Sequence, residues 1–201
     1  MMHPEQHRNP GVVNIVVTGV GGQGVVSATD VIASVALHAG LDVKKSDVHG
    51  MAQRGGAVMS FVRYGGKVYS PIIGQGTADV LIALEELEAL RGAALLKDNG
   101  IVILSDFHTP PPDVALGFKP YPGHIQEQLM ELKPGITCRR AGVYEMLRSF
   151  PGYSINMFLL GLFARFQPYE KMVWLDAMNE KFKKPEMAIK SFLYGYTKEM
   201  V

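Results

Sequence analysis

The sequence of 201 residues has one cysteine, Cys138, and its charges nearly cancel, leaving a formal net charge of +1. A single cysteine excludes a disulfide framework. It also excludes an iron–sulfur cluster held by this chain alone, because a cluster needs about four cysteine ligands. The near-zero net charge gives no electrostatic reason to expect binding to nucleic acid or to a membrane surface.

Long apolar runs are also missing: none approaches the roughly 20 residues of a transmembrane helix. The first ten residues are polar, contain Pro4 and Pro10, and lack the apolar core of a signal peptide. We therefore expect a cytoplasmic protein in which residues 1–11 are a disordered tail. With 47% hydrophobic and 19% charged residues, the chain suits one globular domain over 1–201, whose part 153–201 is helical.

The chain is organised around a glycine-rich stretch, T-G-V-G-G-Q-G, at residues 18–24. An apolar run at 12–17 precedes it, and apolar residues at helical spacing follow it as far as Gly40. This pattern predicts a strand, a glycine turn and a helix. Glycines allow positive φ and close approach to bare main chain. The free N–H groups of the helix's first turn favour an anion or a carbonyl.

The remaining pattern predicts an α/β fold: a three-layer sandwich with a mixed, largely parallel sheet and C-terminal helices. Gly65-Gly66 is typical of a hairpin turn and predicts a strand at 67–69. The proline-rich stretch 107–123 predicts an extended surface excursion. The acidic residues that open the helix after residue 84 are explained by the helix dipole alone. Further strands are expected at 42–48, 57–64, 79–84, 100–105 and 135–140, and a helix at 124–132.

The first glycine stretch satisfies G-x-G-x-x-G, the dinucleotide-binding pattern, which is weak evidence when it occurs alone. If it bound NAD, Asp47 at the end of the second strand would take the ribose hydroxyls, although the preceding Lys44 and Lys45 are unusual there. The alternative is that the glycines serve only tight packing between strand and helix.

A second glycine-rich loop, His49 to Gly56, has no role in a dinucleotide-binding fold. It places an imidazole, an amide and a guanidinium close together. Arg54 suits a phosphate or carboxylate, and His49 could donate or accept a proton near neutral pH. The alternative is a salt-bridged arginine on a structural turn.

Other candidate residues are better explained without function. The i,i+4 pair His3 and His7 lies in the expected tail, and His108 and His124 flank proline-rich loops without a second ligand nearby. Cys138 is expected to be a small core side chain. We expect no metal site.

Taken together, three motifs resemble the gamma-type subunit of 2-oxoacid:ferredoxin oxidoreductases: G-V-G-G-Q-G, S-D-V-H-G-M-A-Q-R-G-G-A-V and S-P-I-I-G-Q-G-T-A-D-V-L-I-A-L-E-E-L-E-A-L-R. The form H-G-M-A-Q-R-G-G is most similar to the beta subunit of indolepyruvate:ferredoxin oxidoreductase. The resemblance covers about residues 14–163 and includes G-F-K-P-Y-P-G and Asn156-Met157. Ser105-Asp106 and the stretch 149–153 depart from it, which bears on the exact substrate.

The resemblance implies a complex that decarboxylates a 2-oxoacid on thiamine diphosphate, passes electrons through iron–sulfur clusters to ferredoxin and transfers the acyl group to coenzyme A. This chain has no G-D-G thiamine motif and too few cysteines for a cluster. By resemblance it is an accessory subunit, inactive alone, in a hetero-oligomer with a larger subunit that carries the thiamine diphosphate and the clusters. The isolated chain could form a homodimer.

No catalytic residue is expected in this chain. The residues expected at the shared active site, where they shape and close it and contact coenzyme A, are Gly19, Gly21, Gly22, Gln23, Gly24, His49, Gly50, Met51, Gln53 and Arg54. The alternative hypothesis is a free-standing Rossmann-like nucleotide-binding protein that uses the first glycine loop alone.

Overall fold

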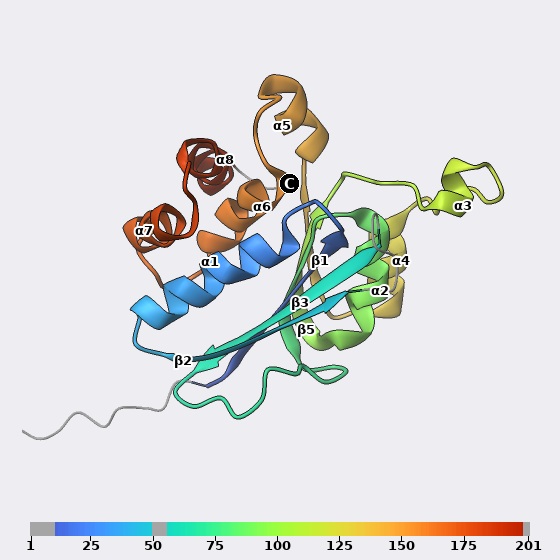
Figure 1. Cartoon of the computed structure of the whole chain (residues 1–201). Helices are drawn as coiled ribbons and strands as arrows, with labels where there is room; N and C mark the ends of the chain where they lie inside the picture. Colours follow the sequence, from blue (N-terminus) through green and yellow to red (C-terminus); the bar gives the residue numbers. More distant parts are fainter. Residues whose placement is uncertain (1–10, 50–55, 199–201) are drawn as a thin grey trace, which may run out of the picture.

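The structure, a computed structural model, describes residues 11–49 and 56–198. Its centre is a six-stranded sheet in the order β2-β3-β1-β4-β5-β6 (Figure 1). Strand β3 is antiparallel to both of its neighbours, and the other five strands run in one direction. The strands are β1 (Val13–Val20), β2 (Asp42–His49), β3 (Ala57–Gly65), β4 (Ala78–Ala83), β5 (Leu96–Ser105) and β6 (Thr137–Ala141).

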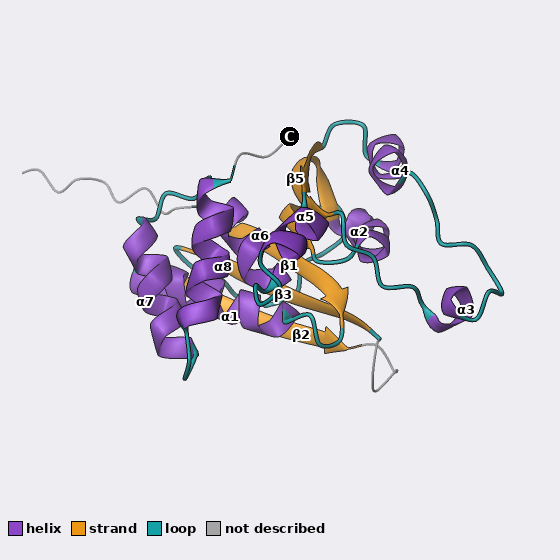
Figure 2. Ribbon diagram, turned by 90° about the horizontal axis from the view of Figure 1, so that it is seen from above, coloured by secondary structure: helices purple, strands orange, loops and turns teal. Residues whose placement is uncertain are grey.

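Helices cover both faces of this sheet, so the predicted three-layer sandwich is confirmed (Figure 2). One face carries α1 (Val25–His38), α5 (Val143–Ser149), α6 (Ile155–Ala164), α7 (Lys171–Lys181) and α8 (Glu186–Thr197). The other carries α2 (Glu86–Gly92), followed by a short 3-10 turn (Ala93–Leu95), and α4 (Ile125–Leu132). The helical C-terminal part was predicted, whereas α5 was not.

The alternation of side chains along the central strands divides the core into two parts. Ile15 and Val17 of β1 pack in the core shared with α1 and α6, whereas Val16 packs in the core shared with α2 and α4. All three are fully buried, because β1 lies between two other strands and has helices on both faces. Such strands read as continuous apolar runs, which is why β1 was recognisable from sequence.

Helices α6 and α8 lie unusually close together. A Cβ atom added at Gly161 would overlap the carbonyl oxygen of Phe192, and one added at Gly195 would overlap that of Phe158. Only glycine allows the two backbones to approach this closely. The prediction of a buried helix at 156–163 is confirmed, since all of these residues are buried.

The predicted hairpin strand at 67–69 is wrong. Residues 67–70 have no regular structure, because β3 already pairs with β2 on one side and with β1 on the other. No edge of β3 is left to accept another strand. The segment is held by side chains instead: the Asp42 carboxylate accepts the Val68 N–H at 2.9 Å, and Arg63 donates to the Ser70 carbonyl at 2.9 Å.

Charged side chains join α1 to the edge strand β2 and to α7. Asp30 of α1 lies 2.9 Å from the ammonium of Lys45 and forms a second ion pair with Lys181. Partial burial raises the pKa of Asp30, but the hydrogen bonds from Lys181 and Lys45 outweigh burial and hold that pKa below its usual range.

None of the helices within residues 11–49 and 56–198 has the length and apolar character needed to cross a membrane. The single-domain organisation over 1–201 stays a prediction. The expected disordered tail lies almost entirely outside the described residues.

Candidate functional site

The glycine turn follows β1 at the carboxyl end of the parallel strands, where open α/β sheets place their ligands. It runs from Gly21 to Gly24 and leads directly into α1. Two of its glycines need positive φ, with values of 97° at Gly22 and 83° at Gly24. The N–H groups in the first turn of α1 have no carbonyl acceptors within the helix, because no helical turn precedes them. They are therefore available to a group that approaches the glycine turn. The predicted strand, glycine turn and helix are confirmed.

The glycines of the turn differ in their surroundings. A Cβ atom at Gly19 would lie 2.7 Å from Gln23 Oε1 and 3.0 Å from Leu84 Cβ, so Gly19 serves packing. One at Gly24 would overlap the side-chain amide of Asn156. At Gly22, by contrast, an added Cβ would meet no atom of residues 11–49 and 56–198 within 4 Å. Among the described residues nothing occupies the side-chain position of Gly22, and its positive φ by itself favours glycine.

Gln23 turns back into its own loop. Its Oε1 accepts the Val20 N–H at 2.8 Å, and its Nε2 lies 3.5 Å from Thr109 Oγ1. Asn156 of α6 fixes the turn from the other side, donating from Nδ2 to the Gly24 carbonyl at 3.0 Å. These contacts give Gln23 and Asn156 the role of holding the shape of the turn.

Beside the turn lies an open hollow of about 320 Å³. Seven described residues line it, and none of these seven has a side chain that can act as an acid or a base. The hollow combines bare main chain with apolar walls, an arrangement that suits positioning of a ligand. The lining residues are Val20, Gly21, Gly22, Gly24, Val25, Val26 and Val58.

The base of the second glycine-rich loop meets the first loop at this hollow. Strand β2 ends at His49, which pairs with Val58 at the start of β3, and the Gly21 N–H donates to the Gly56 carbonyl at 2.9 Å. Residues 50–55 connect these two points. Gly50, Met51, Gln53 and Arg54 lie outside the described residues, and of His49 only the backbone is described.

The sheet order argues against Asp47 as a ribose-binding residue. Strand β3 lies between β1 and β2, so Asp47 is two strands away from the glycine turn, about 10 Å at ordinary strand spacing. Its carboxylate lies 2.8 Å from the Lys45 ammonium and accepts a hydrogen bond from Ser60. In a dinucleotide-binding fold the acidic residue closes the strand next to β1.

The acidic residues after β4 do more than complement a helix dipole. Glu85 is 1% exposed, and its carboxylate caps α2 by accepting the Glu88 N–H at 3.0 Å. It also accepts the Tyr121 hydroxyl at 2.6 Å and the Thr109 N–H at 3.0 Å. Burial, followed by the contact with Glu85, raises the pKa of Tyr121. A carboxylate directly after a buried strand was the sequence signal that could have revealed this role.

Asp106 has a comparable role at the end of β5. Its Oδ1 accepts the N–H groups of Val143 at 2.7 Å and Tyr144 at 3.1 Å, so it caps the first turn of α5. An asparagine can accept the same two bonds through its side-chain oxygen. The side chain of Asp106 therefore has a structural role that does not depend on its charge.

His108, His124 and Cys138 are not among the described residues that line the hollow. His108 and His124 are exposed, as expected. Cys138 is partly buried in β6, and burial raises the pKa of its thiol to about 11. His3 and His7 lie outside the described residues.

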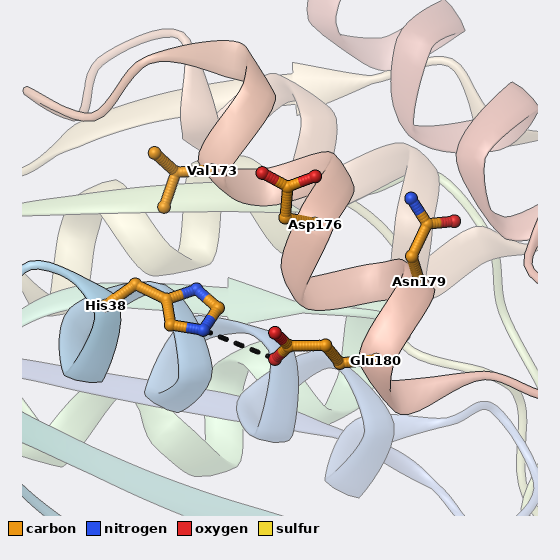
Figure 3. A pocket seen from close by; sticks show the side chains of 5 residues that line it. All are labelled: His38, Val173, Asp176, Asn179 and Glu180. Carbon is orange, nitrogen blue, oxygen red and sulfur yellow. Dashed lines mark ion pairs between the residues drawn. The ribbon is translucent and has the colours of Figure 1, made fainter.

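A second hollow of about 460 Å³ lies between the far end of α1 and α7 (Figure 3). His38 Nε2 is 3.3 Å from Glu180 Oε2, whereas Asp176 and Asn179 do not point toward the imidazole. No three His, Cys, Asp or Glu side chains in the described part of the chain are grouped to hold a metal ion. This hollow is at the opposite end of α1 from the glycine turn.

Comparison with known proteins places this fold and these motifs in one family. The family model described as pyruvate ferredoxin/flavodoxin oxidoreductase matches residues 14–198. Indolepyruvate oxidoreductase subunit IorB of Archaeoglobus fulgidus is 49% identical over 121 residues, which are 60% of this chain and 59% of that relative. The match thus spans less than two thirds of the relative's length.

Two solved structures share the fold. Pyruvate oxidoreductase subunit PORC of Thermotoga maritima superimposes with a TM-score of 0.69 at 18% identity, covering 94% of this chain and 97% of that one. The 2-oxoglutarate:ferredoxin oxidoreductase of Magnetococcus marinus, solved with 2-oxoglutarate, coenzyme A and succinyl-CoA bound, gives a TM-score of 0.69 at 20% identity. The match covers 92% of this chain and 30% of that one. The resemblance first seen in the glycine motifs is confirmed: this chain belongs to the pyruvate ferredoxin/flavodoxin oxidoreductase family.

Proposed function

We propose that this chain is the accessory subunit of a thiamine-diphosphate-dependent 2-oxoacid:ferredoxin oxidoreductase that acts on indolepyruvate or another aryl pyruvate. The family match and the similarity to subunits named for indolepyruvate support this assignment. The observation that carries it is the meeting of two glycine-rich loops at one hollow, joined by the bond from Gly21 to Gly56. A dinucleotide site would use only the first loop.

The larger subunit would hold the thiamine diphosphate and the iron–sulfur clusters. When bound there, these groups remove carbon dioxide from the 2-oxoacid and pass electrons to ferredoxin, and the thiol of coenzyme A receives the acyl group. The residues of this chain would shape and close the shared site. They would contribute no acid or base.

The hollow has the features needed to hold part of coenzyme A. The space beside Gly22 and the first-turn N–H groups of α1 suit a phosphate or a carbonyl oxygen. The walls formed by Val25, Val26 and Val58 suit a chain of methylene groups. Coenzyme A is present in the solved 2-oxoglutarate enzyme with the same fold.

His49, Met51, Gln53 and Arg54 are proposed to face the larger subunit. Arg54 would contact its carboxylates or a bound phosphate through bidentate hydrogen bonds, which lysine cannot reproduce. Replacing Arg54 by Lys should then reduce assembly or turnover roughly ten- to a hundredfold, the equivalent of about 1.5–3 kcal/mol. Turnover that stays at the wild-type level would contradict this role. A lower melting temperature of the free subunit would assign Arg54 to an internal ion pair.

Reconstitution tests the assignment. The chain is co-expressed with the thiamine-motif, C-x-x-C-containing protein of the neighbouring reading frame, and reduction of a viologen is followed with indolepyruvate and coenzyme A. We expect activity only when both chains are present. Equal activity of the larger chain alone would refute the accessory role.

A thermal-shift titration of the isolated chain tests the Rossmann-like alternative. NAD or FAD at about 100 times its dissociation constant would stabilise the fold by about 2.7 kcal/mol. We expect no such shift.

A further inference from the structure

One buried carboxylate holds both ends of the proline-rich arm, residues 107–123. Glu85 Oε1 accepts the Thr109 N–H near the start of the arm and the Tyr121 hydroxyl near its end, at 3.0 and 2.6 Å. The Tyr121 hydroxyl in turn accepts the Leu87 N–H at 3.2 Å. A buried carboxylate is costly unless it is hydrogen-bonded. Separation of the two ends of the arm would therefore leave Glu85 without two of its donors.

The tip of the arm is a structured turn that projects from the body. Helix α3 (Pro112–Ala115) is followed by a turn at Gly117, which has φ 79° and donates its N–H to the Val114 carbonyl at 3.0 Å. Leu116 and Phe118 flank this glycine and expose 69% and 76% of their surfaces. Both views show α3 well away from the sheet (Figures 1 and 2).

The arm is restricted before any partner binds. It contains five prolines, each of which fixes its own φ. Its ends are held by the hydrogen bonds from Thr109 and Tyr121 to Glu85, which we call the Glu85 clamp. Little conformational freedom then remains to be lost on binding. Aromatic side chains such as Phe118 are enriched at the cores of protein–protein interfaces, and a restricted segment loses less entropy when it binds.

The position of the arm indicates its partner. Thr109 at its base lies beside Gln23 of the glycine turn, with 3.5 Å between Oγ1 and Nε2. A subunit that covers the hollow therefore lies next to the base of the arm. We infer that Leu116 and Phe118 insert into an apolar pocket of the thiamine-bearing subunit, and this inference rests on the proposed function. The Glu85 clamp sets the direction in which the arm projects.

Binding of the full chain to that subunit tests the inference. The arm variant combines Leu116→Ser with Phe118→Ser. The matched control combines Tyr69→Ser with Ile72→Ser, which remove side chains that are 89% and 55% exposed, in the loop after β3 at the opposite edge of the sheet. Circular dichroism and melting temperature verify that both variants fold. We expect the arm variant to bind at least tenfold more weakly and the control to bind like the wild type.

Equal affinity of the arm variant and the wild type would overturn the inference. The inference would also be overturned if the isolated wild-type chain is a dimer, the arm variant is a monomer, and the arm variant binds the larger subunit normally. The arm would then contact a second copy of this chain. Failure of the wild type and the control alike to bind the larger subunit would refute the proposed function itself.

The clamp has a separate test. Tyr121→Phe removes the hydroxyl that bridges Glu85 and α2, and Tyr64→Phe is the control because its hydroxyl bonds Gln167 far from the arm. We expect faster amide hydrogen exchange at residues 114–118 and weaker binding only in the Tyr121 variant. Unchanged exchange would overturn the clamp.

Discussion

Alanine at Gly22 should damage the function of the complex far more than the fold of the subunit. The structure offers a close control at Gly76. Both glycines have positive φ, 97° and 69°, and at both an added Cβ would meet no atom of the described part of the chain within 4 Å. They differ in place, because Gly22 lies at the hollow, whereas Gly76 precedes β4 at the opposite edge of the sheet.

The expected loss of stability follows from backbone strain alone. A non-glycine residue held at positive φ costs about 1–3 kcal/mol. In a chain of this size each kcal/mol lowers the melting temperature by about 2–4 °C. Because neither Cβ meets a neighbour, Gly22→Ala and Gly76→Ala should destabilise the free subunit by similar amounts. Gly24→Ala should destabilise it more, since its Cβ would also overlap Asn156.

Turnover of the reconstituted complex separates the two sites. The methyl group at position 22 projects into the space left for a ligand, so kcat/KM for coenzyme A should fall at least about tenfold, equivalent to about 1.4 kcal/mol. Gly76→Ala should leave it unchanged below the melting temperature. Equal effects of the two substitutions on turnover would refute the reasoning and leave the glycine turn with a packing role only.

Three further outcomes are expected. Asn156→Ala removes the donor to the Gly24 carbonyl and should lower the free energy of unfolding in urea by about 1–3 kcal/mol; an unchanged midpoint would contradict the role of this bond. Asp30→Asn should cost at most about 1 kcal/mol at pH 7. Because the folded-state pKa of Asp30 is depressed, that contribution is present above the unfolded value of 3.8 and is lost as pH falls through the folded value. The variant and wild-type melting temperatures should therefore converge in acid; a constant difference would exclude the ion pairs as its source. Cys138, with a thiol pKa of about 11, should react with iodoacetamide at pH 8 far more slowly than free cysteine, and mass spectrometry showing equal rates would disprove its protection.

The strands and the glycine turn could be predicted because their signals are local. Continuous apolar runs predicted the buried strands β1 and β4, and the glycine spacing predicted the turn at 21–24. The prediction of a strand at 67–69 was wrong because the same Gly-Gly sequence can follow a strand with a free edge or a strand without one. Only the position of β3 between β2 and β1 decides that question.

The role of the glycine loops at a shared active site stays a prediction. The space beside Gly22 and the meeting of the two loops at Gly56 agree with the sequence argument, whereas Gln23 holds the turn itself. The role of Glu85 was missed because its donors, Thr109 and Tyr121, are more than twenty residues away. A dipole argument examines only the residue's own helix and cannot detect such contacts.

The antiparallel direction of β3 affects which segment of the fold can change length during evolution. In an all-parallel sheet, each loop at the carboxyl edge leads into a crossover to the next strand. Here the hairpin of β2 and β3 leaves that edge at His49 and returns to it at Gly56. Residues can be inserted or removed between these points without shifting the register of either strand, and lengthening a surface loop costs little. Selection can therefore alter recognition at this edge independently of the layers beneath it.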